Sequence, residues 1–228
     1  TWDASMRIGT NGTIRSMDGG TDNTRFGEDA GAALVSGANN NTLIGHDAGS
    51  TLSSGDENVF VGSQAGDGTT DNSENTGVGY RALTGDIGDQ NTALGAHAGD
   101  ASTGNRNVLL GYNVAQGAGA IDDNVIIGSG AASAATFTGN DAGFDLTSGH
   151  SNVLIGHTSG GITTGIGNTA VGFEALKTED DHGQNVAVGF KALTALNAGL
   201  NANNTAVGYN AATALIGGQQ NVVIGYQA

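Results

Sequence analysis

One five-residue pattern of polar and hydrophobic positions recurs twelve times along the chain. It consists of Asn, then Thr or Val, then a variable residue, then an aliphatic residue or Phe, and then Gly. The first copy begins at Asn23 and the last begins at Asn221. Successive glycines of the pattern lie 16 to 19 residues apart, except for one interval of 28 between Gly128 and Gly156. A fixed period of this size is typical of stacked repeat architectures rather than of globular enzymes.

Each repeat predicts one coil of a stack. With the Asn as position 1, positions 2 and 4 hold residues that favour strands, and alternate strand residues point to opposite faces. The Gly at position 5 permits a tight corner. A small residue three positions later, usually Ala, lets a return segment approach closely, and a polar turn leads to the next Asn. We expect positions 2 and 4, together with this Ala, to fill a thin interior.

The repeat predicts an all-β fold, a parallel β-solenoid of about 13 coils of 16–19 residues. At roughly 4.8 Å for each coil, the stack forms a rod on the order of 60 Å long. Residues 1–22 are expected to form an N-terminal capping coil, and residues 23–228 the β-roll repeat domain. An irregular coil is expected at about 129–151, around a degenerate copy of the pattern at 135–139.

The asparagines and glycines of the pattern are predicted to be structural rather than catalytic. An Asn side chain can bond to turn backbone, and copies stacked in register can form a ladder along the rod. The structural repeat residues are Asn41, Asn58, Asn75, Asn91, Asn107, Asn124, Asn152, Asn168, Asn185, Asn204 and Asn221, with Gly45, Gly62, Gly79, Gly95, Gly111, Gly128, Gly156, Gly172, Gly189, Gly208 and Gly225.

Position 3 is apolar in most repeats, although a solitary solenoid should show a polar residue there. Such a row on an acidic chain predicts burial against another chain. Position 3 shrinks where position 6, just after the Gly, becomes aromatic, so we expect the two positions to share one space in a homo-oligomer. The predicted oligomer interface is Leu43, Phe60, Leu109, Ile126, Leu154, Phe173, Phe190, Tyr209 and Tyr226. An alternative for the aromatic column is a platform for sugars; no ligand-binding residue is assigned.

Composition and charge narrow the class of partner. The chain has 41 Gly and no Pro, which favours an ordered ladder over a disordered linker. Its net charge of −15 speaks against nucleic acid and anionic membranes, which need clustered Lys and Arg. No apolar run of 18 residues is present, so no membrane insertion is expected.

The acidic residues lie mostly between the repeats and are interpreted as a solvated face. Calcium-loop patterns are missing and the histidines are scattered, so we expect no metal and no cofactor. The chain contains no cysteine, so disulfides cannot stabilise the fold. The start at Thr1-Trp2 is neither an initiator Met nor a signal peptide, which suggests a processed product or a fragment.

The repeats resemble the heads of trimeric autotransporter adhesins (YadA-like). Two segments, 168–176 and 204–212, look more like a variant found in fibre proteins of bacteriophages and aquatic bacteria. The resemblance spans residues 5–228. It implies a left-handed parallel β-roll, three copies packed as a homotrimer, and a place on a cell or virion surface. This chain departs from the adhesin pattern in its longer period.

The function expected from these features is a non-enzymatic, extracellular fibre segment that mediates attachment. A host-surface glycan or protein is the expected partner, and three copies would raise the avidity of binding. A purely structural filament or spacer is the alternative. An ice-binding solenoid is a remote one, because it needs a regular array of Thr. A solenoid enzyme needs carboxylates clustered in a groove, and the acidic residues here lie in irregular loops.

Overall fold

The computed structural model describes residues 20–116, 118–128, 146, 148–161, 164–178, 183–196 and 202–228. Twelve strands of three residues each occupy positions 2 to 4 of the twelve repeats. They are β1 (Thr24–Phe26), β2 (Thr42–Ile44), β3 (Val59–Val61), β4 (Thr76–Val78), β5 (Thr92–Leu94), β6 (Val108–Leu110), β7 (Val125–Ile127), β8 (Val153–Ile155), β9 (Thr169–Val171), β10 (Val186–Val188), β11 (Thr205–Val207) and β12 (Val222–Ile224). The strands predicted from the repeat are confirmed.

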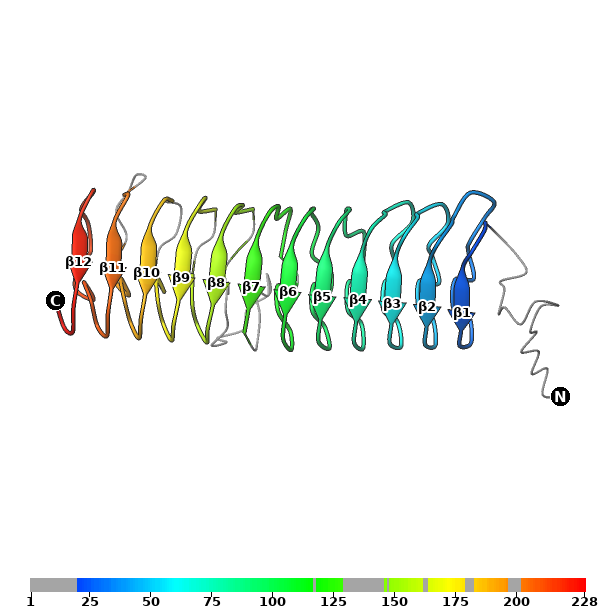
Figure 1. Ribbon diagram of the computed structural model, residues 1–228, viewed down its shortest axis with the longest axis horizontal. Helices are drawn as coiled ribbons and strands as arrows, with labels where there is room; N and C mark the ends of the chain where they lie inside the picture. Colours follow the sequence, from blue (N-terminus) through cyan, green and yellow to red (C-terminus); the bar gives the residue numbers. More distant parts are fainter. Residues whose placement is uncertain are drawn as a thin grey trace.

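The strands form one parallel sheet in sequence order, from β1 to β12 (Figure 1). Each position pairs with the same position of the next coil, as in Leu43 with Phe60 and Ala187 with Ala206. With strands about 4.8 Å apart, the twelve strands span roughly 53 Å. The predicted all-β parallel solenoid is therefore confirmed.

Two predicted features fall largely on residues that the structure does not describe. The capping coil, placed at 1–22, lies outside the described residues up to residue 19, and so do most of the irregular coil and the degenerate repeat at 135–139. The sheet itself continues past the long interval, because Val125 of β7 pairs directly with Val153 of β8. The interval of 28 residues thus leaves the register of the sheet intact.

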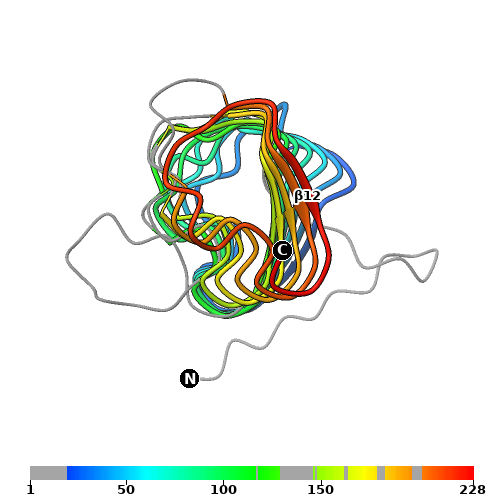
Figure 2. The same ribbon diagram turned by 90° about the vertical axis from the view of Figure 1, so that its left-hand side faces the viewer.

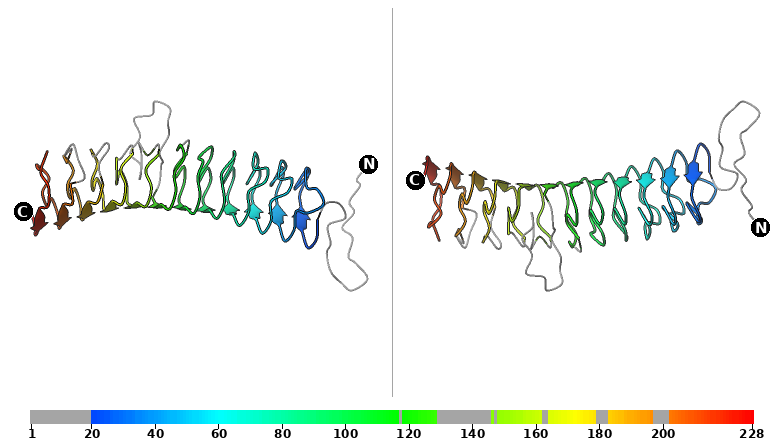
Figure 3. Two further views of the ribbon diagram at one scale, coloured as in Figure 1. Left: turned by 90° about the horizontal axis from the view of Figure 1, so that it is seen from above. Right: turned by 90° about the horizontal axis from the view of Figure 1, so that it is seen from below.

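Each coil wraps a strand and a return segment around a shared interior (Figure 2). The strands lie along one side of the rod and follow a gentle arc (Figure 3). The corner glycine is required at position 5: Gly62 has a φ of +139°, and a Cβ there would lie 2.3 Å from the carbonyl oxygen of Gly79. Successive corners therefore stack backbone on backbone, which only glycine permits.

The interior of each coil is filled by position 3, and this overturns the predicted orientation of the strands. Side chains at position 3 are buried in β2 to β11 and partly buried in the end strands β1 and β12, whereas positions 2 and 4 are partly or fully exposed in every strand. The predicted interface residues Leu43, Phe60, Leu109, Ile126 and Leu154 are at most 1% exposed within the single chain. They pack with the small residue at position 8, such as Ala48 and Ala65, in one continuous core. These five residues therefore cannot line an interface between chains.

The volume of position 3 is balanced by position 9, four residues after the corner glycine, and not by position 6 as predicted. Phe60 faces Gly66, where a Cβ would lie 2.3 Å from the Phe60 ring. The same relation holds for Leu154 and Gly160, at 2.4 Å. Where position 3 is Ala170 or Ala187, position 9 is a fully buried leucine, Leu176 or Leu193. One large and one small side chain thus fill the space in most coils.

The predicted asparagine ladder is confirmed. In eleven successive steps, the backbone N–H of one Asn donates to the side-chain oxygen of the Asn in the preceding coil, at 2.8–3.1 Å. The side-chain amide also donates to the turn that closes its own coil, for example from Asn107 to the Ile121 carbonyl at 2.7 Å. The asparagines from Asn23 to Asn204 are at most 2% exposed. Each one satisfies backbone groups that would otherwise be buried without a partner.

A second ladder, which was not predicted, runs two residues before the asparagines. Here each backbone N–H donates to a side-chain oxygen of the next coil, at 2.6–3.0 Å. Its members are Thr21, Asn39, Asp56, Ser73, Asp89, Asn105 and Asp122. Three of the acidic residues interpreted as a solvated face therefore accept hydrogen bonds from the loop backbone.

Candidate functional site

The outer face of the sheet is an apolar surface that the described coils leave uncovered. We define the outer face as the side chains at positions 2 and 4 of β1 to β12. Position 2 is Thr or Val in every strand, and position 4 is Phe, Ile, Leu or Val. In the single chain the side chains at positions 2 and 4 are partly exposed in most inner strands, and Leu94 of β5 is 53% exposed. Phe26 and Ile224, at 69% and 68%, lie on the two end strands. A continuous strip of β-branched and aliphatic side chains along a rod is unusual for an uncovered surface.

The outer face also brings six threonines into one column at position 2. They are Thr24, Thr42, Thr76, Thr92, Thr169 and Thr205. Sequence reasoning missed this alignment because it assigned position 2 to the interior. Valines interrupt the column at the other six strands, so the threonines form no continuous row.

An aromatic column borders the outer face over the C-terminal coils. The rings of His157, Phe173, Phe190, Tyr209 and Tyr226 stack face to face, with successive centroids 5.4, 5.0, 4.9 and 5.3 Å apart. The four Phe and Tyr rings are 37% to 72% exposed. They are the part of the predicted interface that lies on the surface, and their role between chains stays a prediction.

Charged side chains lie beside the aromatic column, at position 7 and beyond. The Glu174 carboxylate accepts a hydrogen bond from the Lys177 ammonium at 2.9 Å and lies 3.3 Å from the Lys191 ammonium. The Lys191 ammonium also lies 5.5 Å from the centre of the Phe190 ring. The hydrogen bond from Lys177 lowers the pKa of Glu174 against the effect of burial, with further help from Lys191. The outer face therefore ends at a polar rim.

A second group of rings occurs on the coils of β4 to β6. The His97 ring meets Tyr80 edge to face, with centroids 5.1 Å apart, and meets Tyr112 in the same manner at 6.3 Å. His97 Nδ1 lies 2.7 Å from a carboxylate oxygen of Asp100, whose side chain is only 5% exposed. Thr84 also donates to Asp100, and Arg81 and Gln116 approach it at 3.4 Å. Sequence reasoning missed this group, because its members come from three coils.

Burial by itself raises the pKa of the Asp100 carboxyl. The hydrogen bonds from Thr84 and His97 and the positive charge of Arg81 outweigh that effect, so the pKa lies below its ordinary value of 3.8. A lowered pKa in the folded state stabilises the fold above the unfolded pKa, and this contribution is lost as the pH falls through the folded pKa. The stabilisation by Asp100 is therefore present at neutral pH and disappears below about pH 3.8.

We expect Asp100→Asn to lower the thermal midpoint at pH 6 and to flatten its fall between pH 6 and pH 3. Circular dichroism melts at the two pH values measure both effects. The control is Asp86→Asn, which changes an exposed carboxylate on the coil of β4. An Asp100→Asn protein with the same acid dependence as the unmodified chain would contradict this account of the carboxylate.

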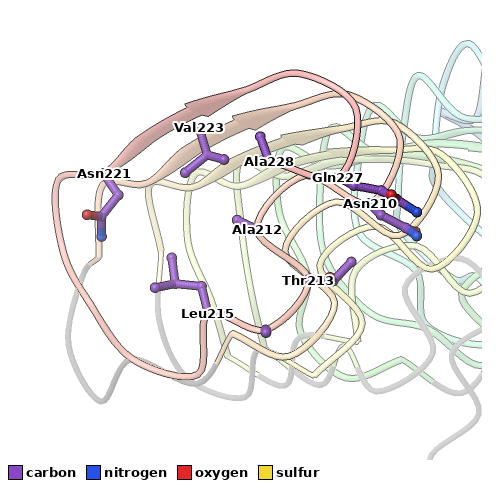
Figure 4. Close-up of a pocket in the computed structure, with 9 residues that line it drawn as sticks. Asn210, Ala212, Thr213, Leu215, Asn221, Val223, Gln227 and Ala228 are labelled. Carbon is purple, nitrogen blue, oxygen red and sulfur yellow. The ribbon is translucent and has the colours of Figure 1, made fainter.

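The C-terminal end of the rod holds a depression of about 590 Å³ (Figure 4). It is lined by interior side chains of the last coils, including Ala212, Leu215 and Val223, and by the ladder residue Asn221. None of its lining residues is acidic, basic or a histidine. The depression is thus an end-on opening of the coil interior and offers no groups for acid–base chemistry.

Comparison with protein-family models, curated proteins and solved structures gives no match. Membership of the trimeric autotransporter adhesin family, or of the phage-fibre variant, remains a prediction.

Among the described residues, no group of three or more His, Cys, Asp or Glu side chains lies close enough together to hold a metal ion. In the same part of the chain, no helix has the length and hydropathy needed to cross a bilayer.

Proposed function

We propose that this chain is a non-enzymatic, rod-shaped segment of a homotrimeric extracellular fibre that mediates attachment at a cell or virion surface. The observation that carries the proposal is the uncovered outer face, with apolar side chains at position 4 of all twelve strands. The number of copies and the left hand of the coil come from the resemblance to trimeric adhesin heads. A structural filament or spacer is the alternative role for the same assembly.

The outer face has the composition of an interface. Exposing inner-strand side chains such as Leu94 at 53% and Val207 at 37% is unfavourable, because apolar surface buried on association contributes about 25 cal/mol per Å². The rim carries Glu174, Lys177 and Lys191, and interfaces commonly have an apolar centre and a polar rim. Two further copies of the same chain fit this face, since each copy brings a matching strip of equal length.

Single-cysteine labelling tests whether the outer face is covered. The chain has no cysteine, so Thr92→Cys and Val35→Cys each introduce one thiol. Thr92 lies on the outer face, whereas Val35 is a 50% exposed residue of a return segment. In the folded assembly, we expect a maleimide to react at least about tenfold more slowly at position 92 than at position 35. Equal rates in the folded protein would show that no partner covers the outer face.

A further inference from the structure

The coil that carries β12 presents an unpaired sheet edge at the C-terminal end of the rod (Figure 1). Among the described strands, β12 pairs with β11 alone. In each of the eleven preceding coils, position 2 donates its backbone N–H to the Asn carbonyl of the next coil, as Thr205 does to Asn221 at 2.8 Å. Val222 has no such acceptor among the described residues. One donor of the sheet therefore points away from the rod at this end.

The acceptors of the same edge are also unpaired. In the inner coils the corner Gly donates its N–H to the position-4 carbonyl of the preceding coil, as Gly225 does to Val207 at 2.9 Å. The Ile224 carbonyl receives no such bond within the part of the chain that the structure describes. Asn204 accepts from the backbone N–H of Asn221 at 3.0 Å, and Asn221 is the last member of that ladder. The end coil thus offers the donors and acceptors that join the inner coils.

The packing surface of the end coil is open in the same way. Val223 at position 3 is only partly buried, and with Leu215 it lines the depression of about 590 Å³ (Figure 4). A Cβ at Gly208 would lie 2.2 Å from the carbonyl oxygen of Gly225. A Cβ at Gly225 would instead meet only the Cβ of Ala228, at 3.6 Å. The end corner therefore has room for the backbone of one more coil.

The aromatic column ends at the same edge. The Tyr226 ring stacks on Tyr209 with centroids 5.3 Å apart and is 72% exposed, whereas Tyr209, with a ring on each side, is 44% exposed. An added ring about 5 Å beyond Tyr226 would continue the column and cover its outward face. The end coil is thus complementary to a segment with an aromatic residue at position 6.

We propose that the end coil binds, in trans, a polypeptide segment that carries the repeat of this chain and an aromatic residue after its Gly. The segment joins the sheet as one more parallel strand. Its Asn carbonyl accepts from Val222, and its Gly N–H donates to the Ile224 carbonyl. Strand addition of this kind takes affinity from main-chain hydrogen bonds and specificity from the alternate side chains. The docking lengthens the rod through its end, so it goes beyond the contact between outer faces.

An antiparallel pairing of β12 with β12 of a second copy fits this edge less well. In that arrangement the Asn of the second strand lies opposite the corner glycine and not beside Asn221. Its aromatic ring is likewise displaced from Tyr226. The ladder of asparagines and the column of rings both require a parallel segment in register.

Fluorescence anisotropy with the full chain tests the proposal. The probe is a labelled peptide with the sequence of residues 185–196, which contains the strand, corner and ring of the β10 coil. Val222→Pro removes the donor of the open edge, and proline is tolerated on edge strands. Val222→Thr is the matched control, because Thr occupies position 2 in six other strands. We expect the peptide to bind the unmodified chain and Val222→Thr, and to bind Val222→Pro at least about tenfold more weakly, which corresponds to about 1.4 kcal/mol.

A second peptide tests the register without changing the protein. Gly189→Pro in the peptide removes the N–H that donates to the Ile224 carbonyl, and should weaken binding by a similar factor. No binding of the first peptide up to about 1 mM, or equal binding to Val222→Thr and Val222→Pro, would overturn the proposal. Equal affinity of the two peptides would overturn it as well. Light-scattering mass of the same proteins reports separately on the trimer, so failure of the end site and failure of the trimer are distinguishable.

Discussion

Replacing Leu94 with glutamate is expected to separate the proposed trimer into single chains that keep the β-solenoid. Leu94 points away from the interior and is 53% exposed in one chain, so an isolated rod tolerates a charge there. In the proposed trimer, three carboxylates would be buried near one another in an apolar interface, which costs several kcal/mol for each unpaired charge. Light scattering reports the mass, and circular dichroism reports whether the strands persist.

Two control variants distinguish loss of assembly from loss of folding. Val35→Glu places the same charge on a residue of equal exposure away from the sheet, and should leave the mass unchanged. Ile126→Asp places a carboxylate inside the coil, where Ile126 is fully buried, and should unfold the coil rather than only separate the chains. A Leu94→Glu protein with the mass of the unmodified chain would show that the outer face is not the contact surface.

The second large effect is expected at Gly66, where a leucine should destabilise the coil of β3 severely. A Cβ at this position would lie within 2.4 Å of two atoms of the Phe60 ring, so the larger side chain cannot fit beside it. Phe60→Ala alone should cost about 3–5 kcal/mol through the cavity it leaves. The double variant Phe60→Ala with Gly66→Leu should recover most of the loss, because it reproduces the pairing of Ala170 with Leu176.

Leucine is compatible with the backbone at position 9. Leu176 and Leu193 adopt φ values of 52° and 50° there, close to the 66° of Gly66. The control combines Gly66→Leu with Leu154→Ala on the distant coil of β8, where no compensation is possible. Thermal midpoints of the unmodified chain, Phe60→Ala, Gly66→Leu and the double variant measure the coupling between positions 60 and 66. A double variant at positions 60 and 66 no more stable than the control would contradict the pairing of positions 3 and 9.

Much of the fold could be predicted because the residues of the repeat determine the backbone conformation of each coil. The Asn at position 1, the strand at positions 2 to 4 and the Gly at position 5 each fix one local geometry. In-register stacking then multiplies that geometry along the rod. The ladder from Asn23 to Asn221 and the positive φ of glycines such as Gly62 follow from these residues alone.

Hydrophobicity alone could not predict which strand positions point into the coil interior. Positions 2, 3 and 4 are all apolar in strands such as Val125–Ile127, so these strands lack the polar alternation that reveals which face points inward. The usable signal was the exchange of volume between positions 3 and 9, as in Phe60 with Gly66. The polar residue Thr at position 2 of six strands was a weaker signal that position 2 points outward. The group formed by Tyr80, His97 and Tyr112 draws on three coils, so spacing within one repeat does not reveal it.

The mass of the unmodified chain in solution tests the central claim most directly. One chain has a mass of 22.4 kDa, and the proposed assembly contains three copies packed through their outer faces. Multi-angle light scattering should therefore give three times the mass of one chain, about 67 kDa, at micromolar concentration and physiological salt. A mass of 22.4 kDa under the same conditions would contradict the account, because the outer face would then be exposed to water.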